Sequence, residues 1–256
     1  MAGPLSQRLL GGKLCLQLLP RAAYSARDPV TEQTLGVTLE RQQGVHAIDS
    51  DRRLDFDTWP GVLAYTPVGV EVFSESAAGG EYLLVRWSGP LADAPTARFS
   101  RRVQSGGHAQ ALALGREARR LLLDPQPDRL ALDECALAFA GLPIVDNPQR
   151  QAPHAFSRVL EQIAEQFDQC LSLEQLAATS GQTELRFLRD FTRAIGLTPH
   201  AYLVDVRVQA ARRLIERSSL PLAAIAQDCG FAHQSHMGSA FRKLLGMTPS
   251  QYRSRF

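Results

Sequence analysis

An internal repeat in the last third of the chain constrains the fold more than any other feature of the sequence. The first copy contains Leu173, Leu176, Ala177, Gly181, Phe191, Gly196, Thr198, Pro199 and Tyr202. The matching residues of the second copy are Leu222, Ile225, Ala226, Gly230, Phe241, Gly246, Thr248, Pro249 and Tyr252. A repeat of this length predicts one supersecondary unit that is used twice.

Each copy is predicted to form a helix, a glycine-containing turn and a second helix. In the first copy, Ser172 precedes a helix that Gly181 ends, because serine favours the N-cap and glycine the C-terminal turn. Thr183 is then expected to cap a helix over 184–194, which Gly196 ends. The first copy therefore predicts a helix-turn-helix unit.

Proline and glycine divide the rest of this region in the same way. Pro199 predicts the first turn of a long helix over 199–217, which spans about 27 Å at about 1.5 Å per residue. In the second copy Pro221 begins a helix, Gly230 ends it, and a further helix covers 233–245. A short last helix begins at Pro249. Two units at the ends of such a rod suit adjacent major grooves of DNA, which lie about 34 Å apart.

The front of the chain has the pattern of short strands followed by helices. Residues 30–104 contain apolar runs bounded by turn signals, and this spacing predicts a small antiparallel β-barrel of a cupin-like kind. Helical spacing then follows over 107–123 and 128–140. The apolar runs cover residues 36–39, 62–65, 68–73 and 82–87.

Prolines separate the two halves. Pro143, Pro148 and Pro153 exclude a continuous helix between residues 142 and 153. We therefore predict an α+β protein with two domains, in which a barrel with two helices precedes an all-α domain with two helix-turn-helix units joined by a long helix. The predicted boundaries are 1–141 for the front domain, 142–155 for the linker and 156–256 for the rear domain.

Composition indicates a soluble cytoplasmic protein. The chain has 256 residues, of which 45% are hydrophobic, and no stretch of about 18 uninterrupted apolar residues predicts a membrane span. Gly11, Gly12 and Lys13 interrupt the apolar segment 9–19, so we expect a strand there and no signal peptide. The four cysteines lack metal-ligand spacing, so we expect reduced thiols and neither a metal nor a cofactor.

Charge is divided unevenly between the halves. Residues 157–256 hold 12 basic and 9 acidic side chains, a net charge of +3, whereas the remainder has a net charge of −1. Of the 28 basic residues only Lys13 and Lys243 are lysines, and arginine can bind phosphate or guanine with two parallel hydrogen bonds. Clustered arginines in the rear domain would therefore favour nucleic acid as a partner.

The second helix of each unit has one apolar and one polar face. Phe187 and Phe191 share a face of the first, and Met237, Phe241 and Leu244 form the buried stripe of the second. The remaining side chains predict a DNA-reading face, since Gln pairs with adenine edges and Arg with guanine or phosphate. The predicted DNA-binding residues are Gln182, Thr183, Leu185, Arg186, Leu188, Arg189 and Arg193 in the first unit, and His233, Gln234, Ser235, His236, Ser239 and Arg242 in the second.

Over residues 157–256 the chain resembles the DNA-binding domain of the AraC/XylS transcriptional regulators. The first half matches at Leu176-Ala177, Leu188-Arg189-Asp190-Phe191, Gly196-Leu197-Thr198-Pro199, Arg207, Ala211 and Leu214. The second half matches at Ile225-Ala226, Cys229-Gly230-Phe231, Gln234-Ser235-His236, Phe241-Arg242-Lys243, Gly246-Met247-Thr248-Pro249 and Tyr252-Arg253.

The resemblance implies seven helices, two helix-turn-helix units and sequence-specific binding to promoter or operator DNA. The front domain is similar to the family's effector-binding or dimerisation half in layout only, so we expect it to sense a small-molecule effector or to form a homodimer. An activator with RNA polymerase as a further partner is one hypothesis, and the sequence leaves repression open as the alternative. Ser239 stands where the family commonly has Arg. Leu185 and Leu188 replace polar or aromatic readers, so either they contact thymine methyl groups or the first helix mainly positions the domain.

Several features allow other interpretations. Trp59, Tyr65 and Trp87 are candidates to line an effector pocket in the barrel, or to pack its core. The acidic run Asp49, Asp51, Asp55 and Asp57 suits carboxylate chemistry, but its spacing also fits the solvent side of a strand and turn. His233 and His236 have metal-ligand spacing without a third ligand. We predict a DNA-binding regulator and no enzymatic activity. The alternatives are a cupin-type enzyme with an accessory helical domain and a DNA-independent interaction protein.

Overall fold

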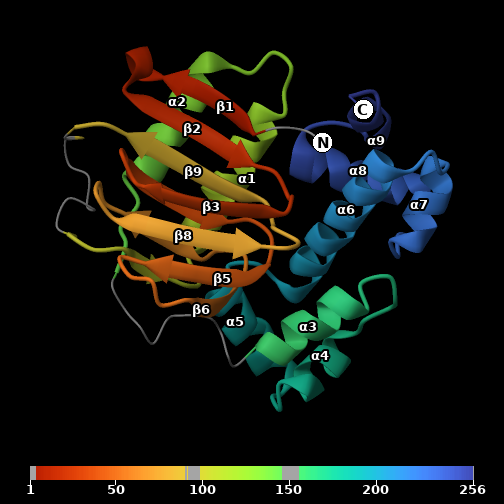
Figure 1. Cartoon of the computed structure of the whole chain (residues 1–256). Helices are drawn as coiled ribbons and strands as arrows, with labels where there is room; N and C mark the ends of the chain where they lie inside the picture. Colours follow the sequence, from red (N-terminus) through yellow and green to blue (C-terminus); the bar gives the residue numbers. More distant parts are fainter. Residues whose placement is uncertain (1–3, 90, 92–98, 146–155, 256) are drawn as a thin grey trace. The chain divides into compact units, whose positions relative to one another are not determined.

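The fold divides between residues 152 and 153 into an N-terminal and a C-terminal unit. The computed structural model describes residues 4–89, 91, 99–145 and 156–255 (Figure 1). Most of the predicted linker, residues 146–155, therefore lies outside the described part. No helix among the described residues is long and apolar enough to cross a membrane.

The N-terminal unit contains two antiparallel sheets. The first has the order β1 (Leu5–Leu9), β2 (Leu14–Leu19), β9 (Tyr82–Trp87), β4 (Gln33–Thr38), β7 (Leu63–Thr66) and β10 (Val103–Ser105), with a short helix η1 (Leu10–Gly12) between β1 and β2. The second has the order β3 (Tyr24–Pro29), β8 (Glu71–Ser76), β5 (Gln42–Ile48) and β6 (Leu54–Thr58). The antiparallel β domain is confirmed, although the described strands form two sheets and do not close into one barrel.

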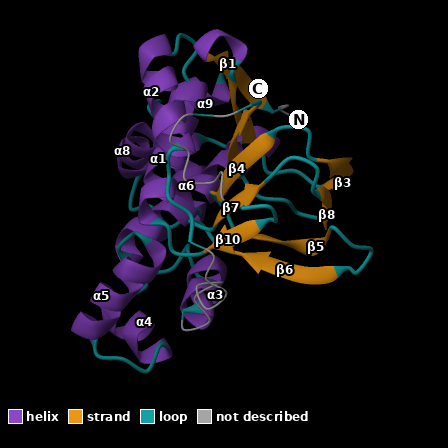
Figure 2. Cartoon of the chain, turned by 90° about the vertical axis from the view of Figure 1, so that its left-hand side faces the viewer, coloured by secondary structure: helices purple, strands orange, loops and turns teal. Residues whose placement is uncertain are grey.

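Two helices cover one face of the first sheet, as Figure 2 shows. They are α1 (Ala109–Leu122) and α2 (Arg129–Ala140), close to the predicted 107–123 and 128–140. The approach is close at Gly115 of α1, where a Cβ atom would lie 2.9 Å from the side chain of Val37 and 2.7 Å from that of Leu39. Glycine at this position therefore allows the helix to rest directly on the sheet.

A buried ion pair also ties α1 to this sheet. Nη1 of Arg119 lies 3.0 Å from Oε2 of Glu81, the residue just before β9, and both side chains are almost fully buried. Removing one partner of such a pair costs about 3–5 kcal/mol, because the other charge is left buried without compensation. The pair therefore fixes α1 against the beginning of β9.

The described residues of the C-terminal unit form seven helices, the number that the family resemblance implies. They are α3 (Ser157–Glu165), α4 (Leu173–Thr179), α5 (Glu184–Ile195), α6 (Pro199–Arg217), α7 (Leu222–Asp228), α8 (Gln234–Leu245) and α9 (Pro249–Arg253). The long helix α6 has the predicted bounds and contacts α3, α5, α7, α8 and α9. In Figure 1, α4 and α5 lie near one end of α6, and α7 and α8 near the other.

The two copies of the sequence repeat pack their aromatic side chains in the same way. The ring centroids of Phe191 and Tyr202 are 6.1 Å apart with an interplanar angle of 75°. The equivalent pair in the second copy, Phe241 and Tyr252, is also 6.1 Å apart, at 70°. Edge-to-face packing of this kind stabilises aromatic pairs beyond the area they bury. Both copies therefore contain the same interior.

One short segment after α3 contacts both the central helix α6 and the turn of the second copy. Arg207 of α6 donates from Nε to the carbonyl of Phe167 (2.7 Å) and from Nη2 to that of Gln169 (2.9 Å). Gly230, in the turn of the second copy, packs against the backbone of the same segment. A Cβ atom at Gly230 would lie 2.7 Å from the carbonyl oxygen of Asp168. The segment therefore holds the central helix and the second turn in a fixed relation.

Candidate nucleic-acid interface

The first helix-turn-helix unit consists of α4, its turn and α5. Ser172 and Gln175 form a reciprocal capping box at the start of α4. Gly181 in the turn has φ +65°, and Gly196 ends α5 with φ +79°, backbone angles that favour glycine. Thr183 is the N-cap of α5, but its side chain makes no capping hydrogen bond, so that part of the prediction was wrong. Thr183 is exposed.

The inner face of α5 is apolar and its outer face is cationic. Phe187 and Phe191 are fully buried, as predicted. Arg186, Arg189 and Arg193 are exposed, by 66%, 66% and 74% of their side chains. Oxygens of Asp190 lie 3.5, 3.6 and 3.7 Å from these three guanidinium groups. Exposed ion pairs contribute only about 0–1 kcal/mol, so the arginines can exchange Asp190 for phosphate.

The remaining predicted residues of the first unit differ in exposure. Leu185 is 78% exposed, whereas Leu188 is half-buried. An exposed leucine side chain does not contribute hydrophobic burial to the stability of the isolated protein. Gln182 is also half-buried, and among the described residues its Oε1 has no hydrogen-bond partner. Leu185 is therefore the apolar side chain of α5 that is open to a ligand surface.

The second unit consists of α7, its turn and α8. His233 caps α8, because its Nδ1 accepts a hydrogen bond from the backbone N–H of His236 (3.1 Å). Gly230 has φ +73° in the turn, and Gly246 ends α8 with φ +72°. Of the predicted buried stripe, Met237 and Phe241 are confirmed. The predicted third member, Leu244, is only half-buried. The next residue, Leu245, is fully buried and takes its place in the stripe.

The outer face of α8 is polar and mostly neutral. The exposed predicted residues are His233, Gln234, Ser235, Ser239 and Arg242. His236 is half-buried, and its ring packs edge-on against Phe231 at 5.4 Å between centroids. The Ser239 hydroxyl donates to the carbonyl of Ser235 (3.1 Å), so it has an acceptor within its own helix.

Sequence reasoning missed one exposed cation in this unit. Lys243 follows Arg242 in the last turn of α8 and is exposed. Its position beside Arg242 in a helical segment was the signal that could have identified it. The second unit therefore places its positive charge at the C-terminal end of α8, beyond the neutral side chains.

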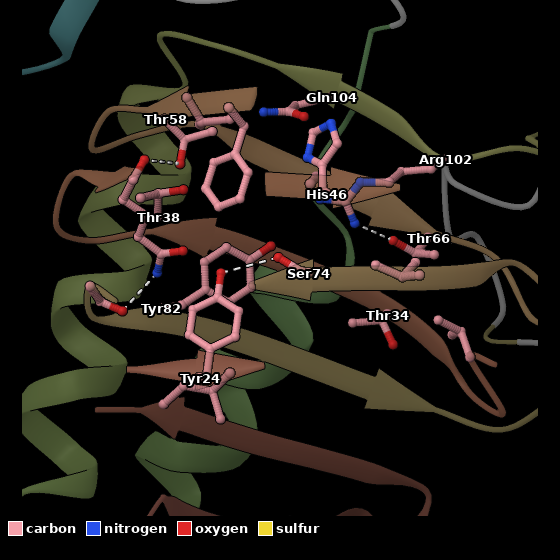
Figure 3. Close-up of a pocket in the computed structure, with 18 of the residues that line it drawn as sticks. Tyr24, Thr34, Thr38, His46, Thr58, Thr66, Ser74, Tyr82, Arg102 and Gln104 are labelled. Atoms are coloured by element: carbon pink, nitrogen blue, oxygen red, sulfur yellow. Dashed lines mark hydrogen bonds between the residues drawn. The ribbon is translucent and has the colours of Figure 1, made fainter. Parts of the chain in front are cut away.

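The N-terminal unit contains a cavity of about 600 Å³ between its two sheets (Figure 3). Its lining does not include Trp59, Tyr65 or Trp87, which corrects the prediction that they line an effector pocket. All three are at most 3% exposed. Alternate residues of a strand point to opposite faces, and the rings of Tyr65 and Trp87 lie on the other face of the sheet from the cavity.

The strand register identifies which residues do face the cavity. Thr34 of β4 pairs with Thr66 of β7 and Arg86 of β9, and all three line the cavity. The next residues along the strands, Leu35 of β4 and Tyr65 of β7, also pair with each other. Because side chains alternate between the faces of a sheet, they point away from the cavity. Polar residues at alternate strand positions were the signal for this cavity, and sequence reasoning did not use it.

The acidic run lies at the surface, which agrees with the interpretation that its spacing places it on the solvent side of a strand and turn. Asp55 and Asp57 are exposed on β6, and Asp57 is paired with Arg41. Asp51 lies 2.8 Å from Arg27, and Asp49 accepts a hydrogen bond from the backbone of Glu71. Among the described residues, no group of three or more His, Cys, Asp or Glu side chains is arranged to hold a metal ion.

Comparisons with known proteins agree with the geometry of the C-terminal unit. Residues 176–255 match a family described as "Helix-turn-helix domain". The protein named "Probable transcriptional regulator LumQ" from Photobacterium leiognathi is 37% identical over 82 residues, which are 32% of this chain and 33% of that protein. An AraC-like transcription regulator of Streptomyces antibioticus is 32% identical over 82 residues, 32% of this chain and 27% of that protein.

A solved structure is similar to part of this chain. The DNA-binding domain of AdpA, a global transcriptional factor in complex with a target DNA, is 30% identical and covers 40% of this chain and 91% of that domain, with a TM-score of 0.38. The chain spans about a third or less of the length of the two curated relatives above. The residues that the family model matches, 176–255, lie in the C-terminal unit, which is therefore similar to the helix-turn-helix regions of proteins named as transcriptional regulators.

Proposed function

We propose that this protein is a sequence-specific DNA-binding transcription regulator whose C-terminal unit reads two adjacent major grooves. The observation that carries the proposal is the duplicated interior, with the ring pair Phe191–Tyr202 matched by Phe241–Tyr252. A duplicated scaffold presents two similar helices, α5 and α8, near the two ends of α6. Two reading helices on one rod suit DNA, which offers equivalent grooves one helical turn apart.

The surfaces of the two helices support different contributions to binding. Arg186, Arg189 and Arg193 are exposed on α5 and suit phosphate and guanine, while Leu185 suits a thymine methyl group. Gln234 and Ser235 on α8 suit base edges. Gln182, Thr183, Leu188, His233, His236, Ser239 and Arg242 complete the proposed contact surface.

The cavity of the N-terminal unit supports control by a small molecule. Its volume of about 600 Å³ falls within the range of about 300–1,000 Å³ typical of ligand pockets. We also propose that the protein acts in the cytoplasm as a homodimer, and that it works with RNA polymerase as an activator, with repression as the alternative. The strand spacing and the prolines of the sequence support a cupin-like N-terminal domain and the domain limits 1–141, 142–155 and 156–256.

A capture experiment with the full chain tests the DNA-binding function. Fragmented genomic DNA is incubated with the protein, bound fragments are sequenced, and their affinities are measured by fluorescence anisotropy at several salt concentrations. We expect a small set of fragments with a shared sequence and an affinity that falls steeply as salt rises. Recovery of no enriched fragment at any salt concentration would contradict the proposal.

One variant separates this function from a DNA-independent interaction module. Arg189→Ala should lower specific affinity by about 1–3 kcal/mol if the protein reads DNA through α5. Arg158→Ala removes an exposed arginine from α3, outside both helix-turn-helix units, and serves as the matched control. Equal affinities of the two variants would favour the interaction module.

A further inference from the structure

The cavity between the two sheets of the N-terminal unit is lined by many side chains with hydroxyl groups. Hydroxyl groups reach it from both sheets, including those of Thr34, Thr66 and Tyr82 on one side and Tyr24 and Ser74 on the other (Figure 3). A cavity that served only as a packing defect would be lined by apolar side chains and would stay dry. A lining that mixes apolar side chains with this many polar groups indicates a site for a ligand with several hydrogen-bonding groups.

Two arginines contribute to this lining, and neither is neutralised by a carboxylate. Arg86 lies on β9, and Arg102 precedes β10. Among the described residues, neither guanidinium lies within the ion-pair distance of 4.0 Å of an acidic side chain. Arg102 donates from Nη1 to the hydroxyl of Thr66 (2.6 Å), while its buried Nε has no hydrogen-bond partner in the described part.

Other arginines of the same unit show the contrast. Arg119, which is fully buried, lies 3.0 Å from Glu81, and Arg27 pairs with both Glu71 and Asp51. A half-buried guanidinium without an anion retains unsatisfied donors and an uncompensated charge, which favours binding of an anion. Its planar fork matches carboxylate and phosphate oxygens with two parallel hydrogen bonds.

The other titratable groups of the lining leave the two arginines in excess. Glu32 is the single carboxylate among the described lining residues, and its Oε1 accepts a hydrogen bond from the Ser88 hydroxyl (2.9 Å), so two cationic side chains face one anionic side chain. Burial lowers the pKa of His46, and the charge of Arg102 lowers it further, so this ring is neutral near pH 7. His46 stacks on Phe56 at 5.2 Å between centroids and can still exchange a hydrogen bond with a ligand.

We propose that this cavity binds a small organic acid that also carries hydroxyl groups, with its acid group on Arg102 and Arg86. The hydroxyl groups of the ligand would bind the threonine, serine and tyrosine side chains, and its carbon skeleton would lie against apolar residues such as Phe56 and Val62. This inference rests on the proposed function, in which the cavity holds the effector. A carboxylate and a phosphate ester share the chemistry that the two arginines recognise.

Binding to the full chain is measured by calorimetry in the absence of DNA, with matched probes. The carboxylate arm compares gluconate, tartrate, mandelate and 4-hydroxyphenylacetate with the amide of each acid. The phosphate arm compares glucose 6-phosphate and glycerol 3-phosphate with glucose and glycerol. We expect at least one acid to bind with a Kd below about 1 mM and its neutral counterpart to bind at least about tenfold more weakly.

Three variants locate the acid group. Arg102→Gln and Arg86→Gln should each weaken binding of that acid by about tenfold or more, and Arg102→Lys should retain part of it. Arg101→Gln removes the neighbouring exposed arginine, which does not line the cavity, and should bind like the original protein. Circular dichroism of each variant verifies that it is folded.

Three outcomes would overturn the inference. They are the absence of binding by every acid of both arms, equal binding of an acid and its neutral counterpart, and unchanged binding by a folded Arg102→Gln variant. The two proposals fail separately. If an acid binds through Arg102 but leaves DNA affinity unchanged, the site stands and the regulatory role fails. If the chain binds specific DNA but no acid, this inference fails and DNA binding stands.

Discussion

Helices α5 and α8 occupy equivalent places in the two helix-turn-helix units, yet they present different surfaces. On α5, three exposed arginines lie within 3.7 Å of Asp190. Helix α8 has no acidic residue, and its exposed face carries Gln234 and Ser235 with cations only in its last turn. Beneath these surfaces, both copies keep the same ring pair at the same 6.1 Å separation. The repeat therefore preserves the interior, while each exposed face has its own chemistry.

The largest expected effect tests whether the two interiors are equivalent. Phe191→Ala and Phe241→Ala should each lower the free energy of unfolding by about 3–5 kcal/mol, because both rings are fully buried. Urea unfolding followed by far-UV circular dichroism measures the loss. Both tryptophans of the chain lie in residues 1–152, so their fluorescence should show an unchanged transition for the N-terminal unit. Leu185→Ala, at an exposed position, is the matched control. A loss confined to one copy would break the equivalence.

The two turn glycines should differ. Gly181→Ala introduces a side chain at positive φ with open space around it, which costs about 1–2 kcal/mol. Gly230→Ala adds a collision with the backbone of Asp168, where overpacking costs about 1–3 kcal/mol more. The same unfolding measurement compares the two variants directly. Equal losses would mean that the segment after α3 yields easily, and that it does not fix the second turn.

DNA binding should distinguish the surfaces. Arg189→Ala should lower affinity by about 1–3 kcal/mol and reduce the slope of log affinity against log salt by about 1 if the arginine binds a phosphate. Gln234→Ala should lower affinity for the specific sequence by about 1–3 kcal/mol and leave the salt slope unchanged, because a neutral side chain displaces no counterions. Anisotropy titrations of both variants at several salt concentrations provide the comparison. Identical salt slopes for the two variants would contradict this division of roles.

The smallest expected effect concerns Asp190. Asp190→Asn removes the negative charge among three arginines and should tighten binding to random-sequence DNA by about 0.2–1 kcal/mol, the size of an exposed ion-pair contribution. The preference for the specific sequence should fall as a result. Glu174→Gln removes a carboxylate from α4, outside the arginine cluster, and is the control. If both substitutions tighten binding equally, Asp190 acts only through net charge.

The helical unit was predictable in detail because local signals determine where its elements end. Pro199 opens α6, and Gly196 and Gly246 end α5 and α8 in the left-handed conformation. The exposure of Arg186 and Arg189 also followed from helical spacing. The failed cap at Thr183 depends on a side-chain rotamer, and the burial of Leu245 in place of Leu244 depends on tertiary contacts. Neither is determined by local sequence.

The β unit was less predictable because the central strands of its first sheet, β4, β7 and β9, are buried on both faces. All four residues of β7 are buried, so alternation of polarity does not show that Ala64 and Thr66 face the cavity while Tyr65 faces away from it. Aromatic residues were the natural candidates for a pocket, yet Tyr65 and Trp87 belong to the packed face. The division into two sheets depends on pairing between distant strands, such as β3 with β8. Such pairing leaves no local signature.

The buried pair of Glu81 and Arg119 links the interior of the β unit to its helical layer. Glu81 directly precedes Tyr82, which lines the cavity, so two adjacent residues belong to opposite faces of the sheet. Because separating the pair is costly, we expect a displacement of Tyr82 and Glu81 at the beginning of β9 to move α1 as well. Binding of a ligand in the cavity would therefore be expected to shift α1 on the opposite side of the sheet, so that the helical layer responds to occupancy of the cavity.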